Sequence, residues 1–222
     1  MLFLMMQKQC SILMPINFGV KMSNKEIILK YLKEKSNEEE VIALLQEHKK
    51  MIANKPGLLG DEDFSLMLKL AKNSKGKIRY HTLVILSNGE VFMSAKNFYE
   101  LCQIAAENLR DKDGNIRQAS FILIKNLNAW MLTLPLITKL QKAGKNEVNI
   151  FYESFRGLFY KLYFSFYHSK EEDIQRFFLK SLEIMLPKFC DMAKFWKDED
   201  EMGMTNKIKD ELNKRLDHGT RN

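Results

Sequence analysis

The apolar positions of this chain recur every three or four residues, the spacing that places them on one face of a helix, whereas strand-like alternation is almost absent. Two capping boxes, in which a serine and a glutamate three residues later can bond each other's backbone, predict helix starts at Ser23 with Glu26 and at Ser36 with Glu39. Helices of about 12 to 20 residues then alternate with short polar turns as far as Leu186. The pattern therefore predicts an all-α chain.

The pattern changes near the C-terminus. Pro187 is predicted to end a helix, because proline lacks the backbone N–H that a helix interior needs. A separate apolar helix is predicted over residues 189–196, and a charged helix around residues 208–216. The acidic run at residues 198–201 is interpreted as a solvated linker, since contiguous carboxylates rarely converge on a metal ion.

An internal repeat is the main organisational signal in the sequence. The segment at residues 76–79, Gly-Lys-Ile-Arg, recurs at residues 114–117 as Gly-Asn-Ile-Arg, which gives a period of about 38 residues. The register extends in both directions, in the pairs Leu66–Ile104, Ile85–Leu123 and Asn88–Asn126. A further step, longer by one position, reaches Phe155 and Arg156, which we interpret as a weaker third copy.

The stretch at residues 111–119 resembles the turn and second-helix start of a HEAT repeat. That family places an aspartate six residues before an arginine that follows a β-branched residue, and Asp111, Ile116 and Arg117 match this pattern. The period of the repeat is also near the ~40–47 residues of helical-pair repeats. The resemblance implies an all-α fold of antiparallel helical pairs, stacked as a short, right-handed HEAT-like α-solenoid.

The resemblance also suggests how the chain is divided. A single HEAT-like domain is predicted over residues 22–217, because a helical pair buries its apolar faces only by stacking on its neighbours. Residues 1–21 precede the first capping box and are predicted to be a disordered extension, and residues 218–222 a disordered tail.

Within the repeats, Asp111 and Arg117 have the spacing of an ion pair between the turn and the following helix, and we interpret this pair as structural. Arg79, Arg117 and Arg156 are therefore not the residues first predicted to bind a ligand. Ile116 and Leu123 are predicted to be buried in the core that the repeats share.

The chain has a formal net charge of +7, and its whole positive excess lies in the central repeats. Residues 64–146 hold thirteen lysines and arginines against five acidic residues. Stacked turns would gather part of this charge into a basic ridge. The ridge residues predicted to bind a partner are Lys69, Lys72, Lys75, Lys77, Arg110 and Lys112. Three interpretations stay open: a solvated lysine-rich face, a nucleic-acid site, or a site for an acidic protein segment.

The predicted helix at residues 148–168 is rich in aromatic residues, with nine between Phe151 and Tyr167. One of its faces is predicted to be a core face. Tyr160, Phe164 and Tyr167 lie on an adjoining face. Either the helix is central to the stack and both faces are covered, or these three residues line a groove for a partner, since tyrosine combines an apolar ring with a polar tip.

No catalytic, metal-binding or cofactor-binding pattern is found in the sequence. The four histidines lack a ligand spacing such as His-Glu-x-x-His, and glycine-rich phosphate loops are absent. Cys10, Cys102 and Cys190 form no CxxC pair, which favours a reducing compartment. No apolar run approaches the ~20 residues that span a bilayer. We therefore expect a cytoplasmic protein, or a nuclear one in a eukaryote, that does not contact a membrane.

These features favour a non-catalytic scaffold or adaptor whose partner is another protein. The alternative is a nucleic-acid-binding module that uses the basic ridge. A third hypothesis, from fold analogy alone, is a HEAT-like DNA glycosylase for alkylated purines, with Trp130 as its candidate aromatic residue. No acidic residue lies within fifteen positions of Trp130, so an enzyme is not predicted. The oligomeric state stays open.

Overall fold

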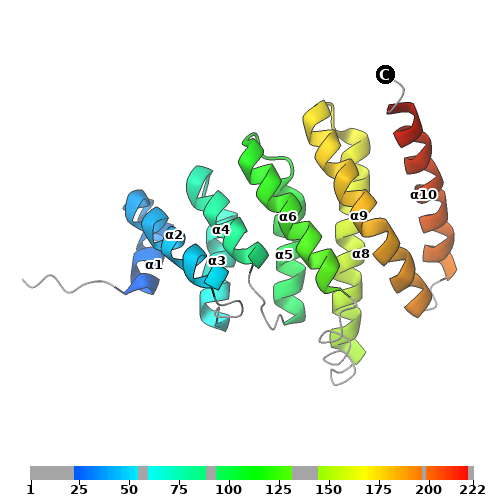
Figure 1. Ribbon diagram of the computed structural model, residues 1–222. Coiled ribbons are helices and arrows are strands. Elements are labelled where there is room, and N and C mark those ends of the chain that lie inside the picture. The colour runs from blue at the N-terminus through cyan, green and yellow to red at the C-terminus, as the bar shows by residue number, and fades with distance from the viewer. Residues whose placement is uncertain (1–22, 55–59, 89–93, 132–144, 197–198, 220–222) are drawn as a thin grey trace, which may run out of the picture.

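The computed structural model describes residues 23–54, 60–88, 94–131, 145–196 and 199–219 (Figure 1). Every regular element within these ranges is a helix. The helices are α1 (Asn24–Glu34), α2 (Glu38–Asn54), α3 (Asp61–Asn73), α4 (Gly76–Asn88), α5 (Ala95–Asn108), α6 (Gly114–Trp130), α8 (Lys145–His168), α9 (Glu172–Trp196) and α10 (Glu199–Gly219). The all-α prediction is confirmed for the residues that the structure describes.

The helices pack as successive antiparallel pairs, α1 with α2, α3 with α4, α5 with α6 and α8 with α9 (Figure 1). Two rows result, because α1, α3, α5 and α8 contact one another in that order and so do α2, α4, α6 and α9. α10 packs against α9 at the C-terminal end. Each pair therefore buries apolar surface against the next pair as well as within itself.

The helix starts follow from local hydrogen bonds. The backbone N–H of Ser23 donates to the Glu26 carboxylate (2.7 Å), and that of Glu26 donates to the Ser23 hydroxyl (3.3 Å), so the first capping box is confirmed. The second predicted box is wrong. α2 begins at Glu38, and the Ser36 hydroxyl donates to the Glu34 carboxylate of the preceding helix (3.4 Å), which engages Ser36 with α1.

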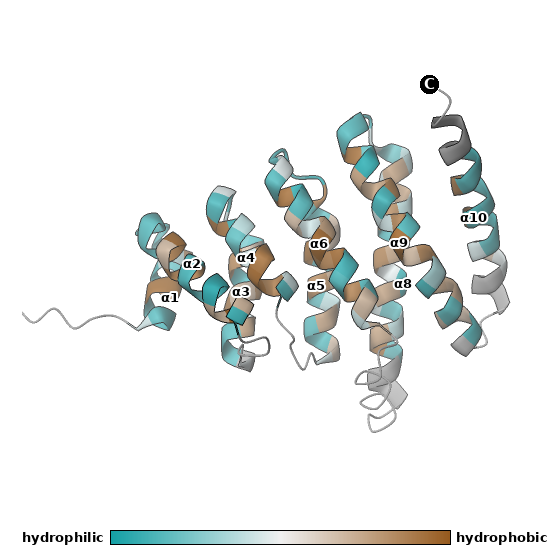
Figure 2. Cartoon of the chain, in the orientation of Figure 1, coloured by the Kyte–Doolittle hydropathy of each residue, from teal (hydrophilic) through white to brown (hydrophobic). Residues whose placement is uncertain are grey.

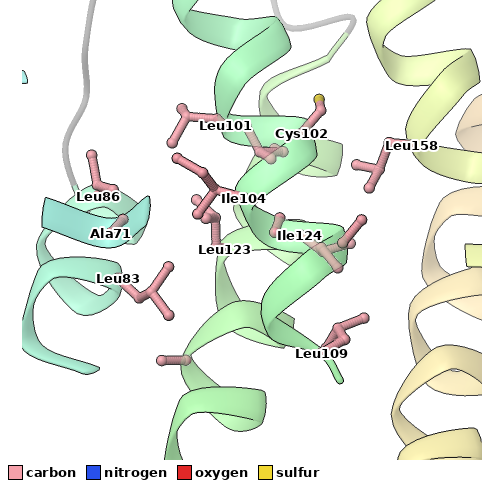
Figure 3. Close-up of a cluster of buried hydrophobic side chains, with 14 of the residues drawn as sticks. Ala71, Leu83, Leu86, Leu101, Cys102, Ile104, Leu109, Leu123, Ile124 and Leu158 are labelled. Atoms are coloured by element: carbon pink, nitrogen blue, oxygen red, sulfur yellow. The ribbon is translucent and has the colours of Figure 1, made fainter. Parts of the chain in front are cut away.

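The internal repeat is visible in the core between α3–α4 and α5–α6. Ile116 and Leu123 of α6 are each 1% exposed, as predicted, and their counterparts Ile78 and Ile85 in α4 are also buried. Figure 3 shows side chains of α3, α4, α5, α6 and α8 in this core. Burial of each aliphatic side chain contributes about 1.5–3 kcal/mol to folding.

The predicted third copy is wrong, because Arg156 lies inside the continuous helix α8 and not at a helix start. α8 packs against α5, so it is the first helix of the fourth pair and α9 is the second. The separation in sequence between the starts of α6 and α9 is longer than the repeat period. At this separation, the buried Ile174 and Met185 of α9 correspond to the buried Ile116 and Leu127 of α6. This longer step includes residues 132–144, which lie outside the described ranges.

The prediction that Pro187 ends a helix is also wrong, because α9 continues through it to Trp196. Pro187 and Glu183, whose carbonyl oxygen lacks its usual helical N–H donor, both lie on the exposed side, where water can replace the missing bond. Leu182 and Phe189, on either side of the proline, are fully buried. Burial along one continuous face therefore outweighs the cost of about 3 kcal/mol that an interior proline imposes.

The linker interpretation of the acidic run is wrong as well, because α10 begins at Glu199. α10 buries Thr205, Ile208 and Leu212, and the side of it seen in Figure 2 is mostly hydrophilic. A helix with a polar outer face closes this end of the packed rows.

The described helices reach both predicted domain limits. α1 is capped by Ser23, and α10 ends at Gly219, just beyond the predicted limit at 217. The predicted extension at residues 1–21 lies outside the described residues, as do residues 220–222 of the predicted tail. None of the described helices is both long enough and apolar enough to cross a bilayer.

Candidate binding surface

The turns that join the two helices of each pair lie along one edge of the molecule, at the top in Figure 1. They comprise residues 35–37, 74–75, 109–113 and 169–171. Neighbouring turns are bonded directly, since the Lys35 amine donates to the carbonyl oxygen of Asn73 at 2.7 Å. We call this surface the turn edge.

All six residues of the predicted basic ridge are exposed and lie on or near the turn edge. Two of them bond a side chain of the following helical pair. Nζ of Lys72 is 3.2 Å from Oε2 of Glu100, and the Arg110 guanidinium donates to the Ser165 hydroxyl. Among the described residues the other four side chains make no ion pair or hydrogen bond. We call these four the lysine cluster: Lys69, Lys75, Lys77 and Lys112.

The predicted ion pair between Asp111 and Arg117 is wrong in its partners. Oδ2 of Asp111 accepts from Nη1 of Arg79, in the preceding pair, at 2.9 Å. Arg117 bends back and donates to the carbonyl oxygens of Asp111 (2.9 Å) and Lys112 (3.1 Å). Its guanidinium lies 5.6 Å from the ring centroid of Phe177 in the following pair. Because Arg117 satisfies the backbone of the turn, the Asp111 carboxylate is left to bridge to α4.

The fourth pair keeps this arrangement with a neutral side chain. Gln175 is the counterpart of Arg117 at the longer step from α6 to α9, and its amide nitrogen donates to the Ser169 carbonyl oxygen at 2.6 Å. Ser169 is in turn the counterpart of Asp111. In the fourth pair a side chain of the second helix therefore still donates a hydrogen bond to the turn, but the donor is a neutral amide and not a guanidinium. The repeated arginine of the second and third pairs therefore gives no sequence signal for the fourth pair, where the position is Gln175.

Two open hollows lie on the turn edge. The first, about 410 Å³, lies between the first and second turns, and the residues that line it include Tyr31, Lys35, Glu38, Lys75 and Gly76. The second, about 330 Å³, lies between the third and fourth turns, and its lining includes Arg110, His168, Lys170, Glu171 and Phe178. The lining of each hollow includes two lysines or arginines and one carboxylate.

The three aromatic residues predicted to line a groove have different environments. Phe164 is 59% exposed, while Tyr160 and Tyr167 are partly buried against the core. The ring centroids of Tyr160 and Phe164 are 6.5 Å apart. Tyr167 packs on Tyr163 (4.9 Å), whose hydroxyl donates to Glu211 of α10 at 2.9 Å. Tyr167 therefore belongs to the contact with α10, and only Phe164 with Tyr160 faces outward.

Phe164 is continuous with the turn edge, because it lies in the last turn of α8. Its neighbour Ser165 accepts the hydrogen bond from Arg110, and Nδ1 of His168 is 2.8 Å from the Phe164 carbonyl oxygen. A carbonyl oxygen only accepts, so Nδ1 carries the proton in that bond and Nε2 is the ring's other polar atom. An exposed aromatic residue is thus next in sequence to the serine that binds Arg110 of the third turn.

Other titratable groups are kept neutral by their surroundings. Burial, together with the charges of Lys49 and Lys77, lowers the pKa of His81. Burial raises the pKa of the Cys102 thiol, and burial followed by the Glu38 charge raises the pKa of Tyr31. No group of three or more histidines, cysteines or carboxylates in the described part of the chain is arranged to hold a metal ion.

Trp130, the residue singled out for a glycosylase, packs on other aromatic rings. Its centroid is 6.0 Å from that of Phe98 and 6.3 Å from that of Phe151, both of which are fully buried. Trp130 is therefore part of the packing between α5, α6 and α8. For this reason we do not propose the glycosylase.

The sequence interpretation missed part of the turn edge. Lys35 lies one repeat period before Asn73, which lies one period before Asp111, so extending the repeat toward the N-terminus would have placed Lys35 in the first turn. No such signal existed for Ser165, because its contact with Arg110 joins residues 55 positions apart at an irregular step.

Comparisons with known proteins add no assignment: no family model, no curated protein and no solved structure matches this chain. The interpretation of the turn edge therefore rests on its geometry and chemistry.

Proposed function

We propose that this chain is a non-catalytic scaffold or adaptor, a short right-handed HEAT-like α-solenoid that binds another protein along its turn edge. The observation that carries the proposal is the exposed ring of Phe164, next in sequence to the serine that binds Arg110, near the same edge as the lysine cluster. Protein interfaces combine an aromatic or arginine anchor, which contributes most of the binding free energy, with a polar rim. The turn edge offers both.

The solenoid interpretation is supported by the bonds between successive pairs. They recur at sequence separations close to the repeat length, in Lys25–Glu62 (37), Lys35–Asn73 (38) and Ser87–Asn126 (39). Among the described helices, extensive contacts join pairs that follow one another, as in a quasi-one-dimensional repeat protein. Such an array presents its turns as one extended surface.

The test is purification of the tagged chain from its native source, followed by identification of stoichiometric partners. We expect a bound protein that is lost when Phe164→Ser is combined with reversal of the lysine cluster to glutamate. The matched control reverses four exposed lysines away from the turn edge, Lys50, Lys125, Lys180 and Lys194, and should keep the partner. Retention of the partner by the first variant, or its loss from the control, would contradict this assignment.

A nucleic-acid-binding module is the second candidate, favoured by the absence of any ion pair in the lysine cluster among the described residues. Lysines without counter-charges can neutralise phosphates, and such binding weakens steeply with salt. The measurement is fluorescence anisotropy with duplex DNA and single-stranded RNA at low and near-physiological salt. Binding that is lost on reversal of the lysine cluster, but not of the control lysines, would select this candidate.

A further inference from the structure

We propose that the turn edge binds an extended acidic segment of the partner protein, with one apolar residue on Phe164 and carboxylates on the lysines of the second and third turns. The inference rests on the proposed function and specifies the chemistry and spacing of the partner segment. Its elements are an apolar anchor at one end, a basic middle, and a carboxylate near each outer hollow.

The anchor is the ring of Phe164, flanked by the half-buried ring of Tyr160. Arg156 covers another side of Tyr160, with its guanidinium 5.9 Å from the ring centroid. An apolar partner side chain can contact the exposed ring of Phe164 while the partner backbone passes Arg110 and His168. Arg110 is already oriented by its bond to Ser165, so little side-chain entropy is lost when it binds a carboxylate.

The charge of the turn edge decides where carboxylates fit. Lys112 in the third turn and Lys75 and Lys77 at the second make no ion pair among the described residues. Glu171 and Glu38 line the two outer hollows, beyond those turns on either side. Acidic partner residues are therefore attracted most strongly to the middle of the turn edge, where the lysines have no ion-pair partner among the described residues.

The distance between neighbouring helical pairs determines how the partner's binding residues must be spaced. Axes of packed helices lie about 8–10 Å apart, so adjacent turns along the edge are separated by about that distance. An extended peptide advances about 3.3 Å per residue, so one step between turns corresponds to about three partner residues. The segment that fits has an apolar residue, a carboxylate about three positions away and a second carboxylate about three positions further.

The same charges favour a peptide over a nucleic acid. A nucleic-acid strand carries a phosphate on every nucleotide, so a strand along the whole edge would also place phosphates near Glu38 and Glu171. A peptide can have neutral residues at those points and still present carboxylates to the lysines.

The experiment uses two fluorescein-labelled synthetic peptides in a Gly/Ser background. One has a leucine followed by aspartates three and six positions later, and the other has the same composition with all three residues adjacent. We expect the spaced peptide to bind the full chain roughly fivefold more tightly, because only it reaches both turns. Reversal of Lys75, Lys77 and Lys112 to glutamate, or Phe164→Ser, should reduce this binding by about tenfold.

Matched controls are Lys125→Glu, Lys180→Glu and Lys194→Glu combined for charge, and Tyr99→Ser for an exposed aromatic residue (49%) far from the turn edge. These variants should bind like the parent, with melting temperatures compared for all variants. Equal affinity for the two peptides, or equal loss in the controls, would overturn the inference. Tighter binding of single-stranded RNA than of either peptide, with the same lysine dependence, would also overturn it.

The two proposals fail separately. If the natural partner is lost from the Phe164 and lysine variants while both synthetic peptides bind equally, the scaffold proposal stands and the spacing is wrong. If the partner is retained by those variants, the turn edge is not its binding site, and both the surface assignment and the segment fail.

Discussion

The first three helical pairs and the C-terminal part of the chain both pack as rows of helices, but they differ in helix length and in the residue types that fill their cores. Helices α1 to α6 are 11–17 residues long, whereas α8, α9 and α10 have 24, 25 and 21 residues. The first region is built mainly on leucine and isoleucine at a regular repeat period, with an arginine–aspartate bridge between pairs. The second has five of the seven largest fully buried phenylalanines among the described residues: Phe151, Phe155, Phe159, Phe178 and Phe189.

The difference shows how helical pairs can keep the same packing when their sequences no longer resemble one another. Where similar aliphatic residues fill each layer, the sequence repeats together with the structure. Where large aromatic rings fill a layer, the neighbouring positions must change volume to preserve close packing, so the sequence no longer matches. The turn hydrogen bond survives as Gln175 to Ser169, because it needs a donor and not a charge.

The largest effect is expected from Phe159→Ala in the C-terminal region. Phe159 is fully buried and stacks on Phe189 with centroids 4.3 Å apart and planes 17° from parallel. Removing the ring should lower the free energy of unfolding by about 3–5 kcal/mol, measured by urea denaturation. The matched control is Phe164→Ala in the same helix, which should change it by less than about 0.5 kcal/mol because that ring is mostly exposed. Similar losses in both variants would contradict the assigned faces of α8.

In the first region, Ile116→Ala and Leu123→Ala test the repeat core. Both side chains are 1% exposed, and each truncation should cost about 2–5 kcal/mol by the same measurement. Ile122→Ala, at a neighbouring exposed position (37%), is the control and should cost much less. If Ile116→Ala and Leu123→Ala both unfold like the parent, the stacked-repeat packing is wrong.

The turn bonds allow a direct comparison of the two regions. Asp111→Ala removes the partner of Arg79 and should cost about 1.5–3 kcal/mol, since a hydrogen bond between charged groups is lost at a half-buried site. Gln175→Ala removes the neutral side chain that takes the place of Arg117 in the fourth pair, and it should cost about 0.5–1.5 kcal/mol. Added salt should reduce the first loss and leave the second unchanged. Equal losses and equal salt dependence would show that charge plays no part in the bridge.

The smallest effect concerns alkaline pH. Burial, followed by hydrogen bonds to Glu211 and Tyr163, raises the pKa of Tyr167 above its ordinary value of 10.0, so the folded chain keeps this proton after the unfolded chain has lost it. Stability must therefore fall as the pH rises above 10. Tyr167→Phe should make the melting temperature less dependent on pH in that range. Tyr31→Phe, in the first region, should have a smaller effect in the same direction. A steeper dependence in Tyr167→Phe would contradict the sign.

Much of the first region could be predicted from the sequence, because its information is local or periodic. The Ser23 capping box, the burial of Ile116 and Leu123, and the exposure of the ridge lysines all follow from spacing along one or two helices. Pro187 was misinterpreted because its local penalty is smaller than the tertiary burial of Leu182 and Phe189, which no local pattern reports.

The sequence by itself determined that the described chain is helical, that its central helices share a period of about 38 residues, and which part of it carries the charge. Only the tertiary structure decided which partners those charges have: Asp111 with Arg79 and not with Arg117, Lys72 with Glu100, and Arg110 with Ser165 beside Phe164. The physical reason is distance along the chain. Helix formation and amphipathicity depend on neighbours within about four residues, whereas a side-chain pair between helices depends on how whole helices are positioned against one another.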